Sequence, residues 1–106
     1  MTKENIISIY NNIEATLREF PKNFERFRSC NAYLATEPLT VKCDATNEWH
    51  SIRVIKSYDT IVAFYDYTTQ CFCEIGKFSR TTSKQLTQIF NQYYVGERVN
   101  AMHIMW

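Results

Sequence analysis

The sequence has few of the residues and segments that are typical of flexible, secreted or membrane proteins. Only two glycines and two prolines occur in 106 residues, so long flexible linkers are not expected. The chain lacks a run of about eighteen apolar residues and a basic-then-apolar start, which argues against a membrane span and a secretory signal. Twelve basic and eleven acidic residues give a net charge of +1. A protein that binds bulk DNA usually has a marked basic excess and a DNA mimic is strongly acidic, so the charge argues against both classes. We therefore expect a cytoplasmic protein.

Metal-ligand spacings are also missing, although the chain has four cysteines. Cys71 and Cys73 alternate with Phe72, so they share one strand face and are not placed to bridge each other. No C-x-x-C or H-x-x-x-H spacing accompanies them, so we expect reduced thiols and neither a metal nor a cofactor. A nucleophile made of Cys71 or Cys73 with His50 lacks a third supporting group, and we expect no enzymatic activity.

Hydrophobic periodicity indicates alternating helical and extended segments. Apolar residues recur every three or four positions up to Phe20-Pro21, and Thr2 is a candidate cap. Thr82 followed by Gln85 matches a capping box at the start of a second helix. The predicted elements are a helix at 2–20, a short helix at 21–29, strands at 39–43, 50–56, 61–65 and 71–76, a helix at 83–95 and a strand at 98–105.

The short connections between the central strands indicate the topology. A parallel crossover needs a dozen or more residues, so these strands should form an antiparallel meander. The segment 61–65 is apolar on both faces, as expected of a strand in the middle of a sheet. We predict one α+β domain, with an antiparallel sheet of four or five strands and two helices packed on one face.

The best candidate site is the turn from Lys77 to Lys84. Its cations and hydroxyls precede the free amides of a helix start, which suits an anion or a partner, although capping alone would also explain the hydroxyls. The outer face of the following helix carries neutral amides, which cost less to desolvate than charges. The candidate binding residues are Lys77, Arg80, Thr81, Thr82, Ser83, Lys84, Gln88, Asn91 and Gln92.

Two segments resemble a known group of proteins. Residues 57–66 (SYDTIVAFYD) and 78–85 (FSRTTSKQ) resemble small uncharacterised proteins of phages and mobile elements, in which "S-Y-[D/E]-T-x-V-A" precedes "S-x-T-T-S-K". The resemblance covers the middle third of the chain. It implies a small accessory protein inside a bacterial host and transfers no activity or functional residue.

Two functional hypotheses remain open. The first is a non-enzymatic inhibitor that binds a host defence complex, such as a CRISPR nuclease, through a protein–protein surface. The second is a nucleic-acid-binding accessory protein that uses Lys77, Arg80 and Lys84, with Tyr93 or Tyr94 for stacking. The expected partner is a host protein or nucleoprotein complex. An exposed Met102–Trp106 tail would instead mark a dimer contact or a partner site.

Overall fold

Helix α1 (Lys3–Glu19) opens the computed structural model, which describes residues 1–28, 30–76 and 78–103. The side chain of Thr2 caps the helix by accepting a hydrogen bond from the amide of Asn5, as expected. The predicted apolar stripe faces the protein core. Its fully buried members are Ile6, Ile9 and Ile13.

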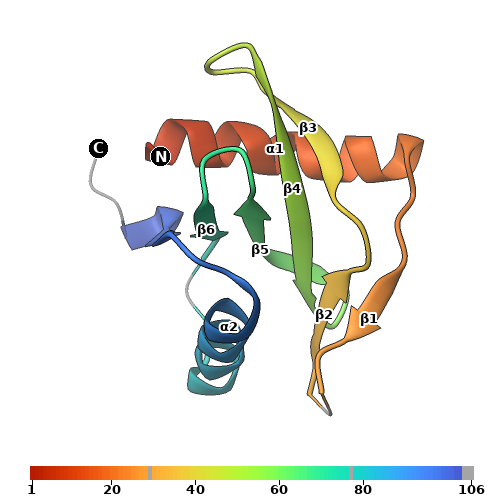
Figure 1. Cartoon of the computed structure of the whole chain (residues 1–106), viewed down its shortest axis with the longest axis vertical. Coiled ribbons are helices and arrows are strands. Elements are labelled where there is room, and N and C mark those ends of the chain that lie inside the picture. Colours follow the sequence, from red (N-terminus) through yellow and green to blue (C-terminus); the bar gives the residue numbers. More distant parts are fainter. Residues whose placement is uncertain (29, 77, 104–106) are drawn as a thin grey trace.

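Within the described residues, seven strands form one sheet, which Figure 1 shows between the two helices. The strands pair in the order β1-β2-β4-β5-β6-β7, and β3 pairs with β4 beside β2. Their bounds are β1 Phe24–Arg26, β2 Ala32–Ala35, β3 Leu39–Cys43, β4 Glu48–Ser57, β5 Thr60–Asp66, β6 Cys71–Glu74 and β7 Glu97–Asn100. Helix α2 (Arg80–Tyr93) lies between β6 and β7 in the chain, and a short 3₁₀ helix, η1 (Ala101–His103), follows β7.

The α+β class is confirmed, but the predicted sheet was too small and wrongly all antiparallel. Strands β3 to β6 match the four central predictions, whereas the short helix at 21–29 is wrong. Its residues include β1, an edge strand whose Phe24 pairs with Ala35 of β2. The three-residue spacing of Phe24 and Phe27 imitates a helical stripe, but both side chains reach the core from extended chain.

Strand β7 makes the sheet mixed because it runs parallel to β6. Helix α2 is the crossover that such a parallel pair requires. The predicted strand at 98–105 is therefore confirmed only at its start, since η1 replaces it from Ala101. Residues 104–106 lie outside the described part of the chain.

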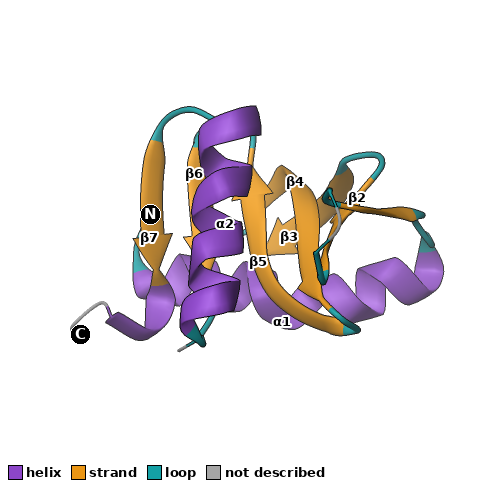
Figure 2. Cartoon of the chain, turned by 90° about the horizontal axis from the view of Figure 1, so that it is seen from below, coloured by secondary structure: helices purple, strands orange, loops and turns teal. Residues whose placement is uncertain are grey.

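The two helices cover opposite faces of the sheet, so their predicted placement on one face is wrong. Alternate residues of β4 point to opposite sides: Ile52 and Val54 pack with α1, and Ile55 packs with α2. Figure 2 shows α2 in front of the sheet and α1 behind it. The apolar character of both faces of β5 follows from this two-sided cover.

Candidate functional site

The predicted site lies at the start of α2, which begins three residues earlier than expected. The Oγ of Ser79, rather than Thr82, caps the helix by accepting a 3.2 Å hydrogen bond from the amide of Thr82. The amide of Ser83 donates to the carbonyl of Ser79 at 3.0 Å, which closes the first helical turn. Residues from Arg80 onward therefore lie on a rigid helix and not in a turn. Lys77 lies outside the described residues.

The two described cations of this site face solvent. Arg80 and Lys84 are exposed, and neither has an ion-pair partner in the described part of the chain. The carboxylates that flank the helix in sequence are already paired. Glu74 accepts two hydrogen bonds from Arg98, at 3.0 and 3.1 Å, and Glu97 lies 3.8 Å from the amino group of Met1. The start of α2 therefore carries positive charge that its surroundings do not neutralise.

The predicted amide face is present, but one of its members already has a partner. Asn91 and Gln92 are exposed and Gln88 is half-buried. The Oε1 of Gln92 accepts a 2.8 Å hydrogen bond from the Nη2 of Arg28. This contact brings Arg28 to the far end of α2. The sequence alone does not place Arg28 near this helix.

The hydroxyls of the site differ in exposure. Thr81 is exposed, whereas Thr82 and Ser83 are half-buried. The Oγ1 of Thr82 lies 3.2 Å from the Oγ of Ser79, and the carbonyl of Ser83 accepts from Thr87 at 3.0 Å. Of the two tyrosines proposed for stacking, Tyr93 is 49% exposed, but Tyr94 is buried at 7% and is not available to a ligand.

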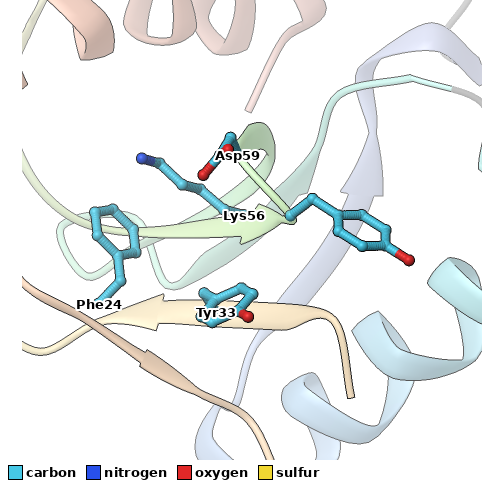
Figure 3. Close-up of a pocket in the computed structure, with 5 residues that line it drawn as sticks. Phe24, Tyr33, Lys56 and Asp59 are labelled. Carbon is cyan, nitrogen blue, oxygen red and sulfur yellow. The ribbon is translucent and has the colours of Figure 1, made fainter.

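A separate hollow of about 400 Å³ lies beside the β4–β5 turn and is shown in Figure 3. Lys56 extends from the end of β4 and Asp59 from the turn, and the Lys56 ammonium lies 4.3 Å from the centre of the Phe24 ring. An adjoining hollow shares both charged residues and adds Glu14 and Arg18. The mixture of charges gives these hollows no preference for a ligand of one sign, so the candidate site remains on α2.

A buried polar pair lies under α1 and was not predicted. The Nδ1 of His50 on β4 lies 2.6 Å from the Oδ2 of Asp66, and Asp66 is fully buried. The other carboxylate oxygen accepts from the amides of Thr68 and Thr69, as is common for an aspartate at a turn. The acceptor capacity of Asp66 is thus used inside the protein, which favours a structural role for the pair.

The Cys71 and Cys73 thiols are free and buried, with their sulfur atoms 3.5 Å apart. Their hydrogen bond lowers the pKa of Cys71 against the opposing effect of burial, whereas the hydrogen bond and burial together raise the pKa of Cys73. Because both residues are at most 1% exposed, a substrate has no path to either sulfur. No group of three histidine, cysteine, aspartate or glutamate residues placed to hold a metal occurs within the described ranges. No described helix is long and apolar enough to cross a membrane.

Comparison with known proteins gives one match. No curated protein and no solved structure is similar to this chain at a significant level. Residues 22–103 match the model of one family, which covers the whole sheet and α2. The chain therefore belongs to a family of unknown function, DUF8033.

Proposed function

We propose that this protein is a non-enzymatic binding protein that uses the outer face of α2 to contact an acidic surface of another protein. The observation that carries the proposal is the exposure of Arg80 and Lys84 without a carboxylate partner in the described chain. A partner that supplies carboxylates there would gain charge complementarity, which raises the association rate and fixes orientation.

The position of Arg98 supports the same surface. Arg98 binds Glu74 through two nitrogens and donates from Nη1 to Thr87 of α2 at 2.8 Å. It therefore links β6, β7 and α2, and it occupies the Glu74 carboxylate. Two apolar residues, Leu86 and Ile89, anchor the opposite side of α2 in the core. The outer face is thus presented on a rigid element, which lowers the entropy cost of binding.

The neutral groups along α2 suit a protein partner. Asn91 and Thr81 are exposed amide and hydroxyl groups that form hydrogen bonds at a lower desolvation cost than charges. Charged residues are generally depleted from the centre of protein–protein interfaces and frequent at their rims. Here the amides lie along the helix, with Arg80 and Lys84 at its start and Arg28 at its end.

The resemblance to small phage and mobile-element proteins suggests the setting. In that setting we propose a partner in the host, a protein or nucleoprotein complex of a defence system such as a CRISPR nuclease, which this protein inhibits by occupying its surface. The binding of nucleic acid at the start of α2 is the competing hypothesis, and it predicts a steep loss of affinity with added salt.

A capture experiment with charge reversal tests the proposal. The wild type, Arg80→Glu/Lys84→Glu and a control, Arg18→Glu/Arg26→Glu, are immobilised and exposed to lysate of the bacterial host. The control reverses two exposed cations on α1 and β1, with the same change in net charge. We expect one partner to be retained by the wild type and the control and lost by the α2 variant. Equal capture by all three proteins would rule out this surface.

A further inference from the structure

Part of the sheet face that carries α2 is left uncovered. The apolar cluster under α2 includes residues of β2, β4, β5 and β6 but none of β3. Figure 2 shows α2 in front of β5 and β6, with β3 and β4 to one side. We name the uncovered region the open sheet face. Its residues are Thr40 and Lys42 of β3, Trp49, Ser51 and Arg53 of β4, and Tyr67 after β5.

Strand register places these side chains together. Trp49 pairs with Lys42, and Ser51 pairs with Thr40. The amide of Tyr67 donates to the carbonyl of Ser51 at 2.9 Å, so Tyr67 lies on the other side of Ser51. Trp49 and Tyr67 are thus diagonal neighbours across two strands, a relationship that separates Cα atoms by about 7–8 Å.

The open sheet face combines aromatic rings with positive charge. It has two exposed aromatic rings, with Trp49 64% and Tyr67 41% exposed. It also has two cations, Lys42 and Arg53, and the hydroxyls of Thr40 and Ser51. Neither a carboxylate nor an aliphatic side chain is among its six residues. The face therefore offers flat rings and cations, with no negative charge among its six residues to repel a phosphate.

Arg53 is held in position on this face. Its Nε donates to the carbonyl of Ala35 at 2.6 Å, and its guanidinium carbon lies 5.8 Å from the centre of the Tyr93 ring. Both contacts restrict the side chain before any ligand arrives, so less entropy is lost on binding. The cation therefore has a fixed place on β4, beside the ring of Tyr93.

A groove of about 410 Å³ continues the face past Trp49. Phe20 and Trp49 line it, and both rings are more than half exposed. Pro38, Leu39 and Thr40 also line it, and Lys22 adds a cation that pairs with Glu37 at 3.5 Å. Two exposed rings around an open groove offer stacking surfaces to a flat ring.

We propose that the open sheet face binds single-stranded nucleic acid. Bases stack on Trp49 and Tyr67, one base enters the groove beside Phe20, and Lys42 and Arg53 contact the phosphates. Stacking rings combined with cations are the usual means of binding single strands. A duplex keeps its bases stacked inside and offers no ring to Trp49, so single strands are favoured. This inference concerns a different surface from α2 and does not rest on the proposed protein contact.

The test is a titration with single-stranded DNA and RNA oligonucleotides of mixed sequence, followed by the fluorescence of Trp49 in a Trp106→Phe background. We expect the fluorescence to be quenched at low salt, an affinity that falls with added salt, and weaker binding to the matching duplex. Trp49→Ala and Tyr67→Ala, assayed by anisotropy of a labelled oligonucleotide, should each weaken binding by about 5- to 100-fold, since each removes one stacking surface. Trp49→Phe should keep most of the affinity.

Two control variants make the test specific. Tyr58→Ala removes a ring that is 67% exposed at the β4–β5 turn and should leave oligonucleotide binding unchanged. Arg80→Glu/Lys84→Glu should also retain binding to within a few-fold, apart from the general loss of positive charge. Absence of binding at low salt, equal affinity for the duplex, or binding that survives Trp49→Ala/Tyr67→Ala would overturn the proposal. Loss of protein-partner capture by that double variant, with no oligonucleotide bound, would identify the face as a protein contact instead.

Discussion

Tyr65 and Tyr94 stack face to face with ring centroids 4.1 Å apart, but only one of their two hydroxyls has a hydrogen-bond partner. The Oη of Tyr65 donates to the carbonyl of Val95 at 2.7 Å. The Oη of Tyr94 is buried and has no partner among the described residues. The stack joins β5 to the residue that ends α2, so it helps to fix the helix on the sheet.

Removing each hydroxyl of this stack should have opposite effects. Tyr94→Phe removes a buried polar atom that has no partner, so we predict a free energy of unfolding that is unchanged or raised by about 1 kcal/mol. Tyr65→Phe leaves the Val95 carbonyl unpaired and should lower the free energy of unfolding by about 1 kcal/mol. Urea denaturation of the two variants measures both changes. A clear loss of stability in Tyr94→Phe would show that its hydroxyl has a partner.

The same two tyrosines predict a loss of stability in alkaline solution. Burial raises the pKa of Tyr94 above the ordinary 10.0, with the charge of Arg53 offsetting part of the rise, and burial also raises the pKa of Tyr65. The folded protein therefore holds these protons more tightly than the unfolded chain. The stability that the two tyrosines contribute is fully present below about pH 10 and is lost as the pH rises through their pKa values in the folded state. Denaturation between about pH 8 and 11 should show this decline, and Tyr94→Phe should reduce its slope.

Gly96 should tolerate substitution far less well than Gly76. At Gly96, where φ is +102°, an added Cβ would lie 2.2 Å from the carbonyl oxygen of Gln70. That oxygen also accepts from the amide of Glu97 at 3.0 Å, so it cannot easily move. We predict that Gly96→Ala lowers the free energy of unfolding by about 3 kcal/mol or more.

Gly76 provides the matched comparison. Its φ of +130° is also unfavourable for alanine, but the nearest atom to an added Cβ is 3.4 Å away, on the Phe78 ring. Gly76→Ala should therefore cost only about 1–2 kcal/mol, from backbone strain alone. Thermal unfolding of the two variants ranks them, and equal losses would contradict the close contact at Gly96.

The buried His50–Asp66 pair predicts that two substitutions of Asp66 will lower the free energy of unfolding by different amounts. Asp66→Ala leaves the amides of Thr68 and Thr69 and the ring of His50 without their acceptor, which should cost about 3–5 kcal/mol. Asp66→Asn keeps an oxygen for the two amides and should lose less. Chemical denaturation distinguishes the two variants. If both variants lose the same free energy of unfolding, the fold depends on the carboxylate itself and not on the hydrogen bonds from the amides of Thr68 and Thr69.

Hydrophobic patterns within a single segment predicted most of the helices and central strands. The Ile6, Ile9 and Ile13 stripe and the alternation of β3 identified their elements correctly, because each pattern arises from one buried face. Strand β5 was identified by a different pattern, a short run that is apolar on both faces. The start of α2 was misplaced because Ser79, Thr81, Thr82 and Ser83 are all possible caps, and sequence alone does not rank them. The predicted cations Arg80 and Lys84 are nevertheless exposed, as the site requires.

The remaining features depend on contacts between distant segments. Whether a helix lies on one face or the other is decided by strand order, and the parallel β6–β7 pair forms only after α2 crosses between them. The His50–Asp66 contact joins two strands, and the Arg28–Gln92 bond spans 64 positions. The open sheet face likewise exists only because β3 lies to one side of α2 (Figure 2). No local pattern contains this information.

The affinity of the purified partner for three matched proteins tests the central claim most directly. Titration calorimetry at about 0.15 M salt would compare the wild type, Arg80→Glu/Lys84→Glu and Arg18→Glu/Arg26→Glu, once equal melting temperatures have shown that all three are folded. If the outer face of α2 contacts an acidic surface, the α2 variant should bind at least about tenfold more weakly, and the control should stay within about twofold of the wild type. Equal dissociation constants for all three proteins would contradict the account.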